Sequence, residues 1–299
     1  MPALSSLLDN HTLQRLERWR PAFSGRFTNR AKGGHLARQG GSSTEFADYR
    51  DYVAGDDLRF VDWNLFARLR RPFLKVFHHE EVSHVMLLVD GSQSMLRENK
   101  FERASQIAAA FALMALRGAE RVRIRVLADG ASANHAPPLA VGRAGFSRLL
   151  AYLENPPKGG TQGIEWAMNE TVKDKPGRGV AVVFSDFFTF GDLPKAMNRM
   201  FASGMEIWGI QLLGPTEIDP SLEQEWRLVD SESGDTLDIT PTGGLIELYQ
   251  EHLNGLQEEI AALCRKRGGR YLRLNTKDNL ELHLFDQLPR AGWMVNAKG

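Results

Sequence analysis

The sequence predicts an α/β fold: a mostly parallel sheet with helices on both faces, together with a small N-terminal β-rich subdomain. Two nearly continuous apolar runs of strand length, 82–90 and 178–186, indicate central strands that are buried on both faces. Segments with helical periodicity, such as 101–120, alternate with the strands. This alternation is typical of parallel sheets whose strands are joined by crossover helices.

The expected elements divide the chain into two domains. Residues 1–80 should hold an N-terminal helix that ends near Pro21 and then the β-rich subdomain, whose short aromatic and β-branched segments lie between residues 45 and 79. Residues 81–299 should form the α/β domain. Its expected elements are, in order, strand 82–90, helix 101–120, strand 121–129, helices near 145–154 and 162–173, strand 178–186, a helix near 192–203, strand 205–213, an inserted β-hairpin near 225–239, a helix over 244–267, strand 270–275 and a short helix near 279–288.

Composition excludes several classes of protein. The 299 residues contain 37 Lys and Arg against 37 Asp and Glu, so no overall field favours nucleic acid, and we expect no nucleic-acid partner. Cys264 is the only cysteine, which rules out an intramolecular disulfide and argues against a zinc–thiolate cluster. The first residues do not resemble a signal peptide, and the longest uncharged apolar stretch, 104–116, is too short to span a bilayer. We therefore expect a cytoplasmic protein without membrane insertion.

Polar side chains follow both of the expected central strands. Strand 82–90 ends in Asp90, and Ser92 and Ser94 follow at alternate positions, so one loop can turn three oxygen-bearing side chains toward one point. Asp186 follows the second strand, and Thr161 follows a Gly-Gly pair. The carboxyl edge of such a sheet is where open α/β folds bind their ligands. Carboxylate and hydroxyl oxygens suit a hard divalent cation such as Mg²⁺.

These five residues resemble the metal-ion-dependent adhesion site of von Willebrand factor A domains. The residue types, their order and the elements that carry them all match: Asp90, Ser92, Ser94, Thr161 and Asp186. The resemblance implies a von Willebrand factor A-like domain that holds one divalent cation, Mg²⁺ first, with Mn²⁺ and Ca²⁺ as alternatives. It also implies that the serines and the threonine contact the metal, that the aspartates act through water, and that an acidic side chain of a partner protein completes the coordination shell.

A second resemblance covers most of the chain, roughly residues 25–290. The segment 43–81 is similar to the bacterial domain of unknown function 58 family, with matching features such as Tyr49-Arg50, Gly55-Asp56-Asp57 and Asp62-Trp63. Members of this family often occur beside MoxR-type AAA+ ATPases. The resemblance therefore implies a MoxR-type ATPase, or a client presented to it, as the protein partner in complex assembly or maturation. The family supplies no reaction.

The region Gly55–Asp62 has two interpretations, which the sequence leaves open. Its carboxylates, Asp56 and Asp57, can accept from Arg50, Arg59 or Arg68 through bidentate forks, in an ionic network that stabilises the subdomain. The same side chains can instead form a surface on which a partner docks.

We expect a non-enzymatic, metal-dependent protein-binding module. The alternative is a metal-dependent hydrolase that uses the same site, which requires a metal-bound water and a general base. The sequence places no obvious spare base at the five residues, although Glu98 and Asp129 are candidates. A third interpretation is a structural subunit in which the metal only stabilises the fold.

Overall fold

The computed structural model describes residues 7–23, 44–79, 84–118, 120–127, 139–156, 162–174, 177–189, 191–220, 226–229, 236–239 and 243–297. The chain forms two compact units, which are described separately. Unit 1 comprises residues 1–24 and 83–299, and unit 2 comprises residues 25–82.

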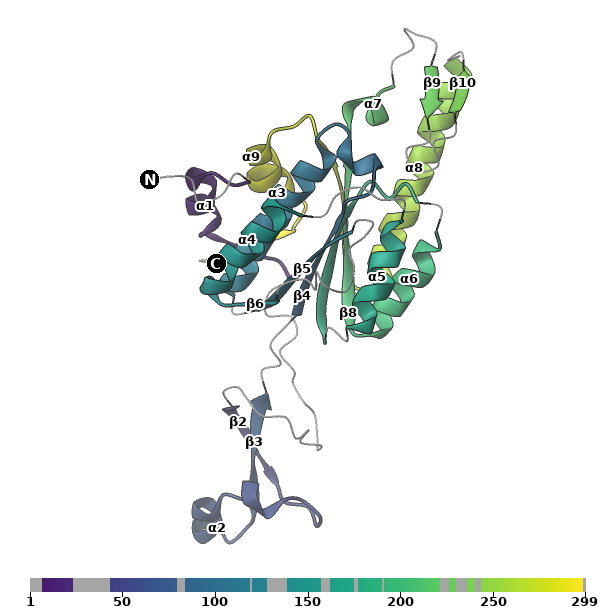
Figure 1. Cartoon of the computed structure of the whole chain (residues 1–299). Coiled ribbons are helices and arrows are strands. Elements are labelled where there is room, and N and C mark those ends of the chain that lie inside the picture. The colour runs from purple at the N-terminus through teal and green to yellow at the C-terminus, as the bar shows by residue number, and fades with distance from the viewer. Residues whose placement is uncertain are drawn as a thin grey trace. The chain divides into compact units, whose positions relative to one another are not determined.

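A six-stranded sheet forms the centre of unit 1 (Figure 1). Its order across the sheet is β11 (Tyr271–Asn275), β8 (Met205–Leu213), β7 (Gly179–Ser185), β4 (His84–Asp90), β5 (Arg121–Leu127) and β6 (Leu139–Val141). All neighbours are parallel except β5 and β6. The prediction of an α/β fold with a mostly parallel sheet is therefore confirmed, and the two continuous apolar runs, β4 and β7, are the two central strands.

The strand order has one reversal point. The chain lays down β4, β5 and β6 in one direction and then returns to the other side of β4 for β7, β8 and β11. In chain order this is 3-2-1-4-5-6, the doubly wound arrangement, whose reversal point lies between β4 and β7. In open α/β sheets, ligands generally bind beyond the carboxyl ends of the strands at such a reversal point.

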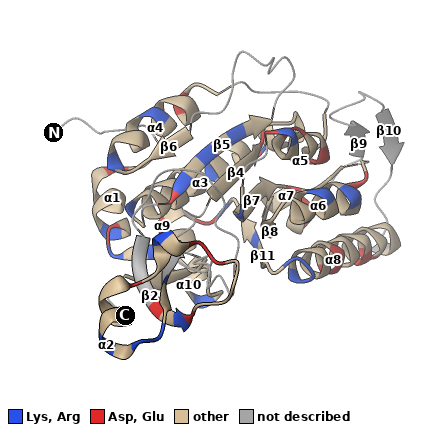
Figure 2. Ribbon diagram, turned by 90° about the horizontal axis from the view of Figure 1, so that it is seen from below, with Lys and Arg blue, Asp and Glu red and all other residues tan. Residues whose placement is uncertain are grey.

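Helices cover both faces of this sheet (Figure 2). α5 (Ile164–Lys173), α6 (Leu193–Ala202) and α8 (Gly243–Arg265) pack on one face, in a core that includes Met86 and Leu88. Alternate residues of a strand point to opposite faces, so the equally buried Leu87 and Val89 face α3 (Lys100–Arg117). α4 (Phe146–Glu154) packs against α3.

The first residues of the chain belong to the α/β unit, which corrects the expected domain boundary at residue 80. α1 (Asn10–Leu16) is shorter than the helix predicted up to Pro21, and Trp19–Pro21 forms a strand, β1, instead. β1 pairs antiparallel with β12 (Met294–Asn296). Phe23 then packs edge-on against Trp208 at a ring-centroid distance of 5.3 Å. Pairing between β1 and β12 therefore holds residues 7–23 on the larger unit.

Unit 2 is an antiparallel pair, β2 (Thr44–Asp51) and β3 (Phe73–His79), with an irregularity between Phe46 and Asp48. The β-rich prediction misses the helix in the connection, α2 (Trp63–Leu69). Asp62 caps α2, because its Oδ1 accepts hydrogen bonds from the backbone N–H groups of Asn64 and Leu65, both at 3.0 Å. The ionic contacts of the Gly55–Asp62 region lie inside this unit: Arg50 forks onto Asp56 at 2.6 and 2.8 Å, and Arg59 contacts Asp57.

The remaining described elements are short. They are the helical turns Leu58–Phe60, Ser94–Leu96 and Arg143–Gly145, α7 (Pro215–Ile218), the antiparallel strands β9 (Trp226–Val229) and β10 (Thr236–Ile239), and a C-terminal run of α9 (Leu280–Leu282), a π-helical turn over His283–Gln287 and α10 (Leu288–Arg290). Within the described ranges, no helix combines the length and the apolar character that crossing a bilayer requires.

Cys264 provides a test of the packing on the α8 side of the sheet. Its side chain is fully buried, and burial raises the pKa of the thiol to about 12. Because the thiolate is the reactive form, we expect Cys264 to resist alkylation by iodoacetamide in the native protein and to react fully in denaturant. Mass spectrometry after timed labelling measures this. Labelling of the native protein at the rate of the denatured chain would contradict the packing.

Candidate functional site

The candidate site lies at the reversal point of the sheet, where β4 and β7 end side by side. The two strands are parallel, with Val89 opposite Phe184. Asp90 is the last residue of β4. Ser185 is the last residue of β7, and Asp186 directly follows it. The side chains of Asp90 and Asp186 are both almost fully buried, with exposures of 3% and 1%. The sequence prediction that two strand-terminal aspartates share one sheet edge is thus met in the structure.

Hydrogen bonds organise the loop after β4 around Asp90. One carboxylate oxygen, Oδ1, accepts from the backbone N–H of Ser92 at 2.9 Å, and Oδ2 accepts from the hydroxyl of Ser185 at 2.5 Å. The hydroxyl oxygens of Ser92 and Ser94 lie 3.1 Å apart. The loop runs so close to β5 that a Cβ atom at Gly91 would lie 2.2 Å from the carbonyl oxygen of Leu127. Only glycine fits there, so Gly91 is the residue that allows the chain to pass this close to β5 as it leaves β4.

A buried lysine, Lys100 at the start of α3, occupies the other half of the site. Its Nζ donates to Oδ2 of Asp186 at 2.8 Å and to Oε1 of Glu217 in α7 at 2.5 Å, and the residue is fully buried. The second oxygen of Asp186 accepts from the backbone N–H of Phe188 at 3.1 Å. Glu217 also accepts from the N–H of Gly214 at 2.8 Å. Asp186 is therefore held by an ammonium group and not by the serines of the Asp90 loop.

The electrostatics of the site follow from burial. Burial and, secondarily, the charge of Asp186 raise the pKa of Asp90 to about 6. Burial alone would lower the pKa of Lys100, but Asp186 and Glu217 outweigh it, so the net shift is upward and Nζ stays protonated. Burial raises the pKa of Glu217 more than Lys100 lowers it. When Asp90, Asp186 and Glu217 are all ionised, their three carboxylates exceed the single ammonium of Lys100 by two negative charges.

Backbone strain also collects here. Outside glycine, four described residues have positive φ, and three of them adjoin the site: Glu98 at 50°, Asn99 at 58° and Phe187 at 59°. Left-handed backbone is unfavourable for residues with a Cβ atom, and it persists only where surrounding contacts enforce it. Phe187 is fully buried, and its N–H donates to the hydroxyl of Ser185 at 2.8 Å. Such strain is characteristic of functional loops.

Four of the five sequence-predicted site residues can be placed. Asp90, Ser92 and Ser94 share one loop, and Asp186 lies beside it. Thr161 lies outside the described residues. Sequence reasoning missed Ser185, Lys100 and Glu217. Ser185 directly precedes a predicted ligand, but Lys100 carries no such signal, because a lysine in the first turn of a helix is normally solvated.

The donor set fits a hard cation in its chemistry. In the portion of the chain that the structure describes, no group of three or more His, Cys, Asp or Glu side chains is arranged to hold a metal. A cation at this edge therefore depends on the carboxylate of Asp90 and the hydroxyls of Ser92 and Ser94, all oxygen ligands of the kind that Mg²⁺ prefers. The excess of two negative charges also matches a divalent ion.

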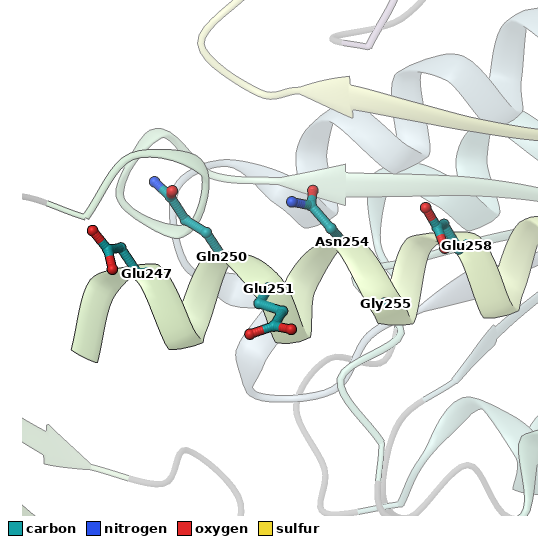
Figure 3. Close-up of a pocket in the computed structure, with 6 residues that line it drawn as sticks. All are labelled: Glu247, Gln250, Glu251, Asn254, Gly255 and Glu258. Carbon is teal, nitrogen blue, oxygen red and sulfur yellow. The ribbon is translucent and has the colours of Figure 1, made fainter. Parts of the chain in front are cut away.

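A separate depression of about 560 Å³ lies along the outer side of α8 (Figure 3). Its lining comes entirely from that helix: Glu247, Gln250, Glu251, Asn254, Gly255 and Glu258. Gln250 and Asn254 project from one side of the helix, whereas Glu251 points to the other. The depression is an open polar surface, and it contains none of the residues of the Asp90 site.

Comparison with known families places the chain. The family model described as "Protein of unknown function DUF58" matches residues 48–251, which is more than half of the chain. The chain belongs to the DUF58 family. This DUF58 match covers both units, because it begins within β2 and ends within α8. It includes Asp90, Lys100, Asp186 and Glu217.

Relatives of this DUF58 chain include uncharacterized proteins of Mycobacterium bovis and Mycobacterium tuberculosis. Each is 25% identical over 249 residues, which cover 82% of this chain and 78% of the relative.

Two solved structures also align. The conserved hypothetical protein BatB from Bacteroides thetaiotaomicron is 16% identical, with a TM-score of 0.41 over 70% of this chain and 98% of BatB. An aerotolerance-related membrane protein from Bacteroides fragilis is 18% identical, with a TM-score of 0.41 over 67% of this chain and 94% of that protein. These TM-scores are too low to support an inference about fold or function.

Proposed function

We propose that this DUF58 protein is a metal-ion-dependent protein-binding module without enzymatic activity. The observation that carries the proposal is the set of oxygen donors at the reversal point of the sheet, Asp90, Ser92 and Ser94, beside a buried carboxylate cluster with two excess negative charges. We infer further that the α/β unit is von Willebrand factor A-like. The order of the six strands and the position of Asp90 and Asp186 support that inference.

In this proposal Asp90, Ser92 and Ser94 hold the cation, with Thr161 as a further ligand by the family resemblance. Asp186 contributes negative charge while it remains paired with Lys100. A bound Mg²⁺ supplies a positive centre to which a carboxylate of another protein can bind. The residues of this chain orient that centre: Ser185 and the N–H of Ser92 fix the carboxylate of Asp90, and Gly91 fixes the loop against β5.

The proposed partner is a MoxR-type AAA+ ATPase, or a client protein that such an ATPase handles. Membership of the DUF58 family supports this choice, through the association of family members with these ATPases that the resemblance implies. An acidic side chain of the partner would complete the coordination shell of the cation. Such a contact is a charge-assisted interaction at a partly buried position, where it is stronger than in bulk water.

The proposal is tested by binding of the purified full chain to the purified MoxR-type ATPase of the same cell, measured by biolayer interferometry in Mg²⁺ and in EDTA. We expect binding in Mg²⁺ that weakens at least ~10-fold in EDTA, because loss of a charge-assisted contact costs on the order of 1.5–3 kcal/mol. The double variant Ser92→Ala, Ser94→Ala should bind in Mg²⁺ as weakly as the wild type does in EDTA.

A matched control removes a serine hydroxyl elsewhere in the same unit. Ser203 follows α6, and its hydroxyl donates to the carbonyl oxygen of Met200, away from the Asp90 loop. Ser203→Ala should bind as the wild type does. Equal affinity of the wild type in Mg²⁺ and EDTA, or full affinity of the double variant, would show that the site does not mediate binding.

A further inference from the structure

Unit 2 carries a concentration of exposed apolar side chains. Of the thirteen large hydrophobic residues that are exposed in the described part of the chain, six lie within residues 49–69. Three of them are in α2: Trp63, Phe66 and Leu69, with exposures of 58%, 37% and 53%. Scattered single residues of this kind are ordinary on a protein surface, whereas a cluster on one short segment marks an interaction site.

The three side chains of α2 share one face of the helix, because they are spaced three residues apart. The rings of Trp63 and Phe66 are in edge-to-face contact, with centroids 6.0 Å apart. Val53 and Leu58, in the segment that leads to α2, are 63% and 56% exposed. No residue of α2 is buried. A seven-residue helix gains little stability on its own in water, so an exposed apolar face on such a helix points to a surface that covers it.

Basic side chains surround the C-terminal end of this helix. Arg68, Arg70 and Arg71 are all exposed. No ion pair joins any of the three to a carboxylate among the described side chains. The three acids between β2 and α2 are engaged elsewhere: Asp56 with Arg50, Asp57 with Arg59, and Asp62 with Lys75 and the N-terminus of α2. The surface at α2 therefore combines an apolar face with three exposed arginines.

We propose that α2, with Val53 and Leu58, binds peripherally to an anionic membrane surface. A helix that presents Trp, Phe and Leu on one face and arginines beside it has the composition of helices that lie in the bilayer interface. Negatively charged headgroups complement the arginines, and tryptophan and arginine are suited to the headgroup level. The contact is interfacial: the apolar side chains of α2 reach the boundary of the acyl region, and α2 does not enter it further. This surface is independent of the Asp90 site.

The test is co-sedimentation of the full chain with vesicles of phosphatidylcholine containing ~30% phosphatidylglycerol, compared with vesicles of phosphatidylcholine alone. We expect at least ~10-fold tighter binding to the anionic vesicles, and a decrease in affinity as salt is raised. Binding to anionic vesicles should not require Mg²⁺ and should persist in EDTA, so its failure is distinct from failure of the metal-dependent protein binding.

Two variants separate the apolar from the ionic contribution. The first variant combines Trp63→Ala with Phe66→Ala. The second combines Arg68→Glu, Arg70→Glu and Arg71→Glu. Each variant should reduce vesicle binding at least ~10-fold. Circular dichroism should be unchanged, because the altered side chains are exposed. Phe201→Ala and Arg290→Glu remove an apolar and a basic exposed side chain from unit 1 and should bind as the wild type does.

Equal binding to both kinds of vesicle, absence of binding, or full binding by both variants would overturn the proposal. Sedimentation-velocity ultracentrifugation identifies the main competing occupant. If the wild type self-associates without vesicles, the Trp63 variant does not, and vesicle binding is absent, the face is an interface between copies of this chain and the membrane proposal is wrong.

Discussion

Lys100→Met is expected to lower the free energy of unfolding by about 3–5 kcal/mol, because it leaves Asp186 and Glu217 without their counter-ion inside the protein. Methionine has nearly the length of lysine, so the change removes the charge and its hydrogen bonds but little volume. Urea denaturation at neutral pH, without divalent cations, measures the effect. The loss should be smaller when Mg²⁺ is present if a cation binds beside Asp186.

An ion pair on the surface of the same unit provides the control. Lys173 and Glu170 form an ion pair on the surface of α5, with side-chain exposures of 70% and 28%. Lys173→Met should change the free energy of unfolding by less than about 1 kcal/mol. Combining Lys100→Met with Glu217→Gln should restore part of the loss, since the double variant leaves one uncompensated carboxylate and not two. A loss at Lys100 no larger than that at Lys173 would show that the ammonium is not a buried counter-ion.

Asp90→Asn is expected to abolish stabilisation of the protein by divalent cations. A ligand that binds only the folded state stabilises it by about 2.7 kcal/mol at one hundred times its dissociation constant, so the wild type should show a clear rise in melting temperature with Mg²⁺ or Mn²⁺. Asparagine keeps the shape of the side chain but removes the charge that a cation needs. Differential scanning fluorimetry over a titration of each metal measures the difference.

Without metal, the free energy of unfolding of Asp90→Asn should lie within about 1 kcal/mol of that of the wild type, because two effects oppose one another. The loss of charge relieves the repulsion by Asp186 that contributes to the raised pKa of Asp90, whereas the amide accepts fewer hydrogen bonds from Ser185 and Ser92. Asp219→Asn alters an exposed carboxylate after α7 and should respond to metal as the wild type does. A metal-induced shift of Asp90→Asn equal to that of the wild type would rule out Asp90 as a ligand.

Much of the α/β unit was predictable because its signals are local. A strand that is buried on both faces must be apolar along its whole length, so β4 and β7 stand out in the sequence as central strands. The helices between the strands follow from their periodicity. Both ends of α3 and of α6 lie within one to three residues of their predicted positions. α2 was missed because its three exposed apolar residues resemble strand residues when they are read as part of a β-rich segment.

The sequence by itself determined the alternation of the main strands and helices of the α/β unit and the presence of an aspartate at the end of each central strand. Both depend on residues that are neighbours in the chain. The tertiary structure alone decided that β1 pairs with β12, which joins the two ends of the chain, and that Lys100 lies buried between Asp186 and Glu217. A lysine at the start of a helix is ordinarily solvated. Only the convergence of α3, β7 and α7 supplies the two carboxylates that offset the cost of its burial.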